Sequence, residues 1–179
     1  MKRVSILLAT GFEEIEALAP LDVLRRLNYD VELVSMTNSY IVESSHGVSI
    51  KADKMYDLEI MNSNAIVIPG GMPGAINLRS DERVISLVRK FHDDNKLVAA
   101  ICAGPIVLGK ANILSDKSST SYPGFEEALN CKEYLNEDVV VSNNVITSRG
   151  PATAFKFAFE IAKYLGLDVT KLLESMLFN

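Results

Sequence analysis

A strand-to-helix corner at Cys102 constrains the fold of this chain more than any other stretch. Residues 97–101 are apolar and typical of a buried strand, and residues 106–111 are apolar enough for a short helix. The corner between them is tight and requires small residues two positions before and after Cys102, where the chain has Ala100 and Gly104. This spacing is that of a nucleophile elbow, with alanine in the first glycine position and cysteine in place of serine.

Two interpretations of Cys102 remain open from this stretch alone. The backbone N–H groups at the start of the helix would face the sulfur and favour its thiolate form, which makes Cys102 a reactive residue. A free cysteine is also among the residue types most often buried, which would make Cys102 a structural residue.

Length, charge and cysteine content narrow the class of protein. A length of 179 residues is typical of one domain, so we expect residues 1–179 to share one core. No apolar run approaches the roughly eighteen residues of a membrane span, and no cleavage-like signal follows the N-terminus, so we expect a soluble, cytoplasmic protein. The 18 Lys and Arg residues are not concentrated in one segment and the net charge is −5, which argues against a nucleic-acid partner. Cys102 and Cys131 differ in their surroundings, so we expect no disulfide and an exposed, spare thiol at Cys131.

A carboxylate lies on the apolar face of the first predicted helix. Residues 3–9 are typical of a strand, and the helix expected at 12–27 follows it. Glu16 shares the apolar stripe of this helix with Phe12, Ala19, Val23 and Leu27. A buried carboxylate is costly unless it is hydrogen-bonded or its pKa rises, so Glu16 is a candidate site residue; a helix-end position half in water is the alternative. The neighbouring Glu13 and Glu14 suit the helix dipole.

Glycines follow the strand predicted at 64–68. The segment 69–74 frees the backbone N–H groups of Gly70 and Gly71 to face an anion, as an oxyanion hole requires, although a plain turn has the same composition. The glycine spacing does not match the dinucleotide-binding fingerprint, and the chain contains no phosphate-binding loop motif. We therefore expect no cofactor.

These three features follow predicted parallel strands and converge on one edge of the sheet. In an open α/β sheet that edge is where ligands bind, so we expect one shared crevice. The residues then suggest Cys102 as the thiolate nucleophile and the amides of Gly71 and Ala103 as oxyanion donors. Glu16 would hydrogen-bond the sulfur or move a proton.

Neither histidine has a persuasive position beside Cys102. His46 falls in the turn of a hairpin that we expect at 38–50 on the edge of the main sheet, where it is either near the site or merely solvated. His92 falls on the polar end of a helix that we expect to be capped at 80–82 and to end near Asp94. No paired Cys or His at zinc spacing occurs, so we expect no metal.

The chain resembles the ThiJ/PfpI superfamily, and within it the branch of the parkinsonism-associated protein and its bacterial relatives. The resemblance covers nearly the whole chain and rests on four segments in this order: Gly-Phe-Glu-Glu-Ile-Glu at 11–16, Pro-Gly-Gly at 69–71, Ala-Ala-Ile-Cys-Ala-Gly-Pro at 99–105 and Thr-Ser-Arg-Gly-Pro-Ala-Thr at 147–153. It implies a flavodoxin-like α/β fold, which is a three-layer sandwich with a mostly parallel central sheet and helices on both faces. It also implies a homodimer, a protonated Glu16 hydrogen-bonded to an oxidation-sensitive Cys102, and a Gly70–Gly71 amide in an anion pocket.

The resemblance further implies a stress-protective role. In members of this branch the cysteine is oxidised to a sulfinate under peroxide stress, and these proteins are credited with glyoxalase, deglycase and chaperone activities. We therefore expect a cysteine-dependent protein that acts on small electrophiles, such as methylglyoxal or its adducts, or that senses peroxide through Cys102. The alternatives are a redox-regulated chaperone or binding module without turnover and, more weakly, a PfpI-like cysteine peptidase or amidase.

Four positions depart from the family pattern or carry two interpretations. Ala103 stands where the protease-like branch has a histidine, which removes the usual base. Tyr122 stands where many relatives have a histidine, and His46 stands where bacterial relatives often have arginine. Arg149 matches the family's Ser-Arg-Gly-Pro motif, yet an arginine at a helix entry also serves as a structural hydrogen-bond donor to carbonyls. His46, Tyr122 and Arg149 are thus accessory candidates.

Overall fold

A seven-stranded sheet forms the centre of the computed structural model, which describes residues 2–178. The strand order is β10-β11-β7-β6-β1-β2-β5, and each pair is parallel except β10 with β11. The central strands β6 and β7 are continuous apolar runs, and β1 is apolar except for Arg3 and Ser5, as expected for parallel strands covered on both faces. The strands are β1 (Arg3–Leu8), β2 (Asp30–Ser35), β5 (Lys54–Met55), β6 (Ala65–Ile68), β7 (Leu97–Ile101), β10 (Val139–Ser142) and β11 (Val145–Ser148).

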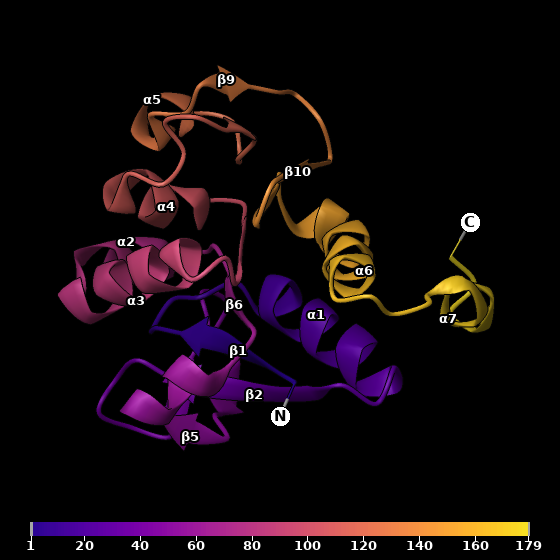
Figure 1. Cartoon of the computed structure of the whole chain (residues 1–179). Helices are drawn as coiled ribbons and strands as arrows, with labels where there is room; N and C mark the ends of the chain where they lie inside the picture. The colour runs from indigo at the N-terminus through magenta and orange to yellow at the C-terminus, as the bar shows by residue number, and fades with distance from the viewer. Residues whose placement is uncertain (1, 179) are drawn as a thin grey trace.

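Helices cover both faces of this sheet, which confirms the predicted three-layer α/β sandwich. Figure 1 shows α1 (Glu14–Arg26) and α6 (Ala154–Tyr164) on one side of the strands. On the other side lie α2 (Gly74–Ser80), α3 (Glu82–Asp93) and α4 (Pro105–Ala111). Each helix layer packs an apolar face on the sheet, so two separate hydrophobic cores lie on its two sides.

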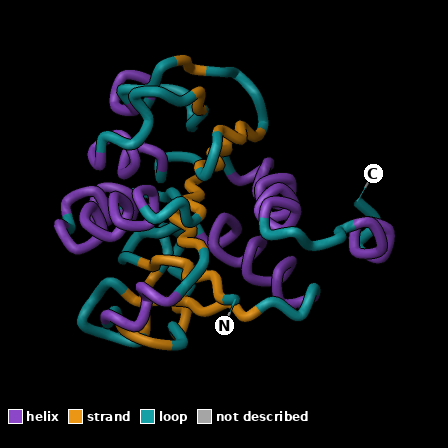
Figure 2. The backbone as a smooth tube through the Cα atoms, in the orientation of Figure 1, coloured by secondary structure: helices purple, strands orange, loops and turns teal. Residues whose placement is uncertain are grey.

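The remaining elements are short, and most of them border loops (Figure 2). They are the antiparallel pair β3 (Ile41–Glu43) and β4 (Ser49–Lys51), the parallel pair β8 (Ser118–Ser119) and β9 (Glu133–Tyr134), the 3-10 helices η1 (Leu58–Asn62) and η2 (Pro151–Thr153), and the helices α5 (Glu126–Leu129) and α7 (Thr170–Ser175).

The hairpin predicted at 38–50 forms, but its expected place on the edge of the main sheet is wrong. It is a separate two-stranded sheet, and β5 is the edge strand beside β2. The reason is that the hairpin is tied to the start of α1: Gly11 N donates to Glu43 O at 2.8 Å, and Ser45 N donates to Phe12 O at 2.8 Å. These bonds place the hairpin turn beside the carboxyl end of β1.

Three further predictions concern single residues or helices. The helix expected from 80–82 begins at Glu82 with Asp81 as its N-cap, because a separate helix, α2, extends through Ser80. The exposed thiol predicted at Cys131 is wrong, since this side chain is half-buried against the core that contains α3 and α4. Within residues 2–178, the structure has no helix both long enough and apolar enough to cross a membrane.

Candidate active site

Cys102 occupies the corner between β7 and α4, as the sequence predicts. Its φ of +64° lies in the left-handed region, which is uncommon for a residue with a side chain. Two backbone hydrogen bonds hold the corner: Cys102 N donates to Ser148 O at 2.9 Å, and Tyr122 N donates to Cys102 O at 2.9 Å. Gly104 is required here, because a Cβ atom at this position would lie 2.5 Å from Ile68 O.

Glu16 is fully buried in the first turn of α1, which confirms its predicted position facing the core. Its Oε2 atom accepts a hydrogen bond from Gly70 N at 2.8 Å. Its Oε1 atom is buried and has no protein hydrogen-bond partner among the described residues. Burial raises the pKa of Glu16 to about 7, and the charge of Glu13 adds to this, while hydrogen bonding with Cys102 and Gly70 acts in the opposite direction.

Gly70 is the point at which the thiol, the carboxylate and a backbone amide meet. A Cβ atom built on Gly70 would lie 2.7 Å from Cys102 Cβ, 2.7 Å from Glu16 Oε2 and 2.8 Å from Ala103 N. Only glycine fits between these groups. The structure therefore brings together Cys102, Glu16, Gly70 and Ala103, which come from three separate strand ends.

The pKa of Cys102 is raised to about 12, in contrast to the thiolate that the helix start favours. Burial is the largest cause, followed by the charge of Glu16 and a hydrogen bond with Glu16, and these outweigh the backbone N–H groups of Ala103 and Gly71, which lower the pKa. The two contributions from Glu16 belong to its ionised form and vanish when Glu16 is protonated. The pair therefore shares one proton, and a thiolate at Cys102 is stabilised when that proton resides on Glu16.

The two glycine amides have different partners. Gly70 N is bonded to the carboxylate of Glu16, whereas the Gly71 amide acts on the Cys102 sulfur. Gly71 has a φ of +83°, and a side chain there would meet the backbone of Phe12, with a Cβ atom 2.6 Å from its carbonyl carbon. The anion-facing donors beside the sulfur are thus Gly71 and Ala103, the pair assigned to that role from the sequence, and the role itself stays a prediction.

Glu13 is a site residue that the sequence analysis treated only as a partner of the helix dipole. It is the buried N-cap of α1: its Oε2 accepts from Glu16 N at 2.8 Å, while its own N–H donates to Gly70 O at 3.0 Å. Glu13 therefore fixes the backbone at both Glu16 and Gly70. Glutamate is not among the preferred N-cap residues, so the sequence offers little signal for this role.

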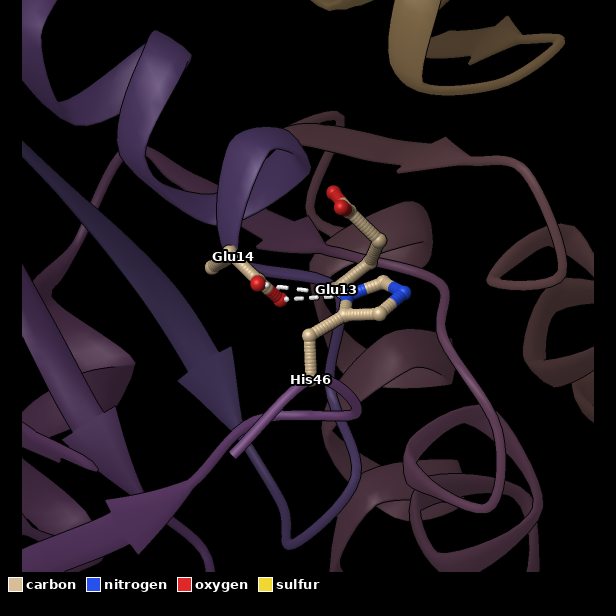
Figure 3. Close-up of side chains that lie close together, drawn as sticks. All are labelled: Glu13, Glu14 and His46. Carbon is tan, nitrogen blue, oxygen red and sulfur yellow. Dashed lines mark hydrogen bonds and ion pairs between the residues drawn. The ribbon is translucent and has the colours of Figure 1, made fainter. Parts of the chain in front are cut away.

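His46 is held at the surface by Glu14. Its Nδ1 atom lies 3.1 Å from Glu14 Oε2, and hydrogen bonding with this carboxylate raises the pKa of His46. Figure 3 shows Glu14 turned toward His46, while the carboxylate of Glu13 points away from this pair. One ligand atom from each of Glu13, Glu14 and His46 lies within 4.8 Å of the others, the one such group of three in the described chain. The ion pair accounts for the proximity of Glu14 to His46, whereas the Glu13 carboxylate is held nearby as the N-cap of α1. The absence of a metal site stays a prediction.

Tyr122 and Arg149 lie beside the backbone of Cys102. Tyr122 donates its N–H to Cys102 O, and Arg149 follows Ser148, which accepts from Cys102 N. The ring of Tyr122 covers Gly150, where a Cβ atom would lie 3.3 Å from Tyr122 Cδ2. The Arg149 guanidinium donates to none of the carbonyls in residues 2–178, so the structural role considered for it from the sequence finds no support. The ring of His92 lies at the end of α3, where its Nδ1 atom contacts Asp93 and not a residue of the site.

Comparison with known proteins agrees with the α/β fold described above. The sequence profile of the DJ-1/PfpI family matches residues 2–164. A deglycase of Pyrococcus horikoshii is 33% identical over 91% of this chain and 99% of its own length. A solved structure described as Toxoplasma gondii DJ-1, oxidized, superposes with a TM-score of 0.93 at 33% identity and covers 99% of each chain.

Some relatives are longer proteins. Protein DJ-1 homolog B of Arabidopsis thaliana is 36% identical over 93% of this chain, which corresponds to 39% of the plant protein. The chain thus spans about two fifths of the length of this relative.

Proposed function

The chain belongs to the DJ-1/PfpI family, and from this membership we propose that it is a cysteine-dependent stress-response protein acting on small electrophiles. The observation that supports this most directly is the buried Glu16 beside Cys102, with Gly71 and Ala103 amides acting on the same sulfur. A relative named as a deglycase supports carbonyl chemistry. We propose α-oxoaldehydes such as methylglyoxal, or their adducts, as substrates, without a cofactor.

The first step forms a hemithioacetal. The Cys102 thiolate attacks the aldehyde carbon, the carbonyl π electrons move to oxygen, and protonated Glu16 supplies the proton that the new hydroxyl requires. The N–H groups of Gly71 and Ala103 stabilise the oxyanion as it develops.

The second step is an internal redox change that needs no external oxidant. Ionised Glu16 removes the proton from the former aldehyde carbon and returns it to the adjacent carbonyl carbon. The hydroxyl proton moves to the adjacent carbonyl oxygen, and the product is a 2-hydroxy thioester on Cys102. Water then cleaves the carbon–sulfur bond and regenerates the thiol, so methylglyoxal plus water gives lactate. A carboxyl group whose pKa is close to neutral suits both proton transfers.

Turnover of methylglyoxal tests this proposal. Loss of methylglyoxal and gain of lactate should be equimolar and exceed the enzyme concentration many times over. Cys102→Ala should abolish both, and Cys131→Ser is the matched control that should retain them. Equal lactate formation by wild type and Cys102→Ala, or no turnover by wild type, would refute the catalytic claim.

A redox-regulated chaperone or binding module is the second candidate, supported by the carboxylate beside the sulfur and by a relative crystallised in an oxidised form. A thiolate displaces hydroxide from peroxide to form a sulfenate, and a second equivalent gives the sulfinate. Intact mass after graded peroxide should show Cys102 gaining two oxygens before Cys131 or the methionines change. Earlier oxidation of those other residues would rule out a sensing role for Cys102.

Peptidase or amidase chemistry is less favoured, because neither His46 nor His92 is placed as a base for Cys102. We propose a homodimer and a cytoplasmic location on the family resemblance. An apolar hollow of about 390 Å³, bordered by Ile15, Leu18 and Phe155 on α1 and α6, suits a contact with a second copy. Light scattering coupled to size exclusion measures the oligomeric state, and Ile15→Glu should shift a dimer toward monomer.

A further inference from the structure

A second small pocket adjoins Cys102 and is not used by the chemistry above. Its volume is about 310 Å³, and its walls are mostly apolar, formed by Tyr122, Pro123, Pro151 and Ala152. Arg149 and Asp138 provide its charged groups. A pocket with apolar walls and few polar groups is typical of a small-molecule subsite, and this volume lies at the small end of that range.

The pocket lies next to the reactive corner through the backbone. Tyr122 donates its N–H to Cys102 O, and the residue before Arg149 accepts from Cys102 N, both at 2.9 Å. The two sides of the pocket therefore flank the main chain of Cys102. The pocket walls, which do not include the Cys102 side chain, thus lie beside the main chain of that residue.

Arg149 is the charged residue of this pocket that forms no ion pair within residues 2–178. Asp138 forms an ion pair with Lys156, with 2.5 Å between Oδ2 and Nζ. Arg149 has no carboxylate within ion-pair distance among residues 2–178, and no acceptor for its guanidinium within hydrogen-bond distance there. The positive charge of Arg149 lowers the pKa of Glu126 on α5. The Glu126 carboxylate, however, is hydrogen-bonded to Gly124 N, which lies 2.8 and 3.0 Å from its two oxygens.

We propose that Arg149 and the ring of Tyr122 form a specificity subsite for a carboxylate on the substrate. A planar guanidinium binds a carboxylate through two parallel hydrogen bonds. The preferred substrates are then small α-oxoaldehydes that carry a carboxylate, rather than neutral ones such as methylglyoxal. The substrate class named here rests on the carbonyl chemistry proposed for Cys102. The binding of an anion beside the thiol is independent of that chemistry.

Alkylation of Cys102 by two isosteric reagents tests this without any turnover. Iodoacetate carries the carboxylate that iodoacetamide lacks, and Cys131→Ser leaves Cys102 as the reacting thiol. The ratio of the iodoacetate rate to the iodoacetamide rate should be at least about threefold higher in the folded protein than in the same protein in urea. Arg149→Gln should return that ratio to the unfolded value while the iodoacetamide rate stays close to wild type.

Controls separate local recognition from net charge and from misfolding. Lys110→Gln removes the same unit charge at the far end of α4 and should leave the ratio unchanged. Arg149→Lys keeps the charge without the planar fork and should retain an intermediate ratio, which covers the case in which Arg149→Gln fails to fold. An equal ratio in wild type, Arg149→Lys and Arg149→Gln would overturn the inference.

Failure of this inference and failure of the proposed function give different results. A raised, Arg149-dependent ratio in a protein that turns over neither methylglyoxal nor 4,5-dioxopentanoate, an α-oxoaldehyde that carries a carboxylate, would support the subsite and refute the catalytic proposal. Methylglyoxal turnover with a ratio independent of Arg149 would refute the subsite alone. With both correct, kcat/KM for 4,5-dioxopentanoate should fall more in Arg149→Gln than kcat/KM for methylglyoxal.

Discussion

Gly70 N lies 2.8 Å from Glu16 Oε2, so this amide holds the carboxylate against Cys102 and is not free for a bound anion. The bond joins the loop after β6 to the first turn of α1. It leaves the second oxygen of Glu16 without a protein partner in the described chain, on a carboxyl group whose pKa is near neutral. The protonation of Glu16 therefore has consequences for both stability and reactivity.

Stability should fall as the pH rises through the titration of Glu16. The pKa of Glu16 is raised from 4.5 to about 7 in the folded protein, so its protonated form is the favoured buried form. Its contribution is fully present below pH 4.5 and is lost as pH approaches 7, by roughly 3 kcal/mol. Urea unfolding at several pH values should show this loss in wild type and not in Glu16→Gln. A parallel pH dependence of the two proteins would contradict the assignment.

Reactivity of Cys102 should show the shared proton directly. In a Cys131→Ser background, the iodoacetamide rate of wild type should show two steps with pH, one of them near 7, because the two groups titrate as a pair. Glu16→Gln should show a single step at a pKa below about 12, since the charge that opposes the thiolate is gone. A pKa near 8.5 in both proteins would indicate an ordinary, unperturbed cysteine.

Gly70→Ala should damage the site and the fold together. The added methyl group would lie 2.7 Å from both Cys102 Cβ and Glu16 Oε2, and overpacking of this kind costs about 1–3 kcal/mol. Urea unfolding measures the loss, and a slower reaction of Cys102 with iodoacetamide locates it. Gly47→Ala is the matched control: its methyl group meets nothing within 4 Å, so its cost is limited to backbone strain at a φ of +79°. Cys102 reactivity should be unchanged in that variant.

His46 should titrate above the ordinary histidine value because of Glu14. Hydrogen bonding with Glu14 raises the pKa of His46, so an NMR titration of its ring should show a value above 6.5 that returns toward 6.5 in Glu14→Gln. His46→Gln should leave the alkylation rate of Cys102 unchanged. A large change in that rate would place His46 in the active site after all.

The sequence predicted the features of the fold that depend on local patterns. Five apolar residues before Cys102, and a carboxylate on an apolar helical stripe, were sufficient to place β7 and the buried Glu16. The position of the 38–50 hairpin was wrong because it depends on bonds between Gly11, Phe12 and residues more than thirty positions away. No local pattern contains such pairings.

The electrostatics of the site were less predictable than its position. The helix start indicated a lowered pKa for Cys102, but the sign depends on burial and on the proximity of Glu16, which only the assembled structure gives. Glu13 was assigned to the helix dipole alone because its hydrogen bond to Gly70 joins two strand ends that are distant in the sequence. The sequence also did not show that the Arg149 guanidinium forms no ion pair within residues 2–178, because this depends on where distant carboxylates lie in the folded structure.

The left-handed backbone conformation of Cys102 lowers the stability of the folded protein. A side chain in this conformation costs about 1–2 kcal/mol relative to glycine, which adopts the same φ without strain. Glycine at position 102 would therefore give a more stable corner than cysteine does. The chain thus carries at this corner a side chain that lowers its own stability, and this cost supports the chemical role proposed for Cys102.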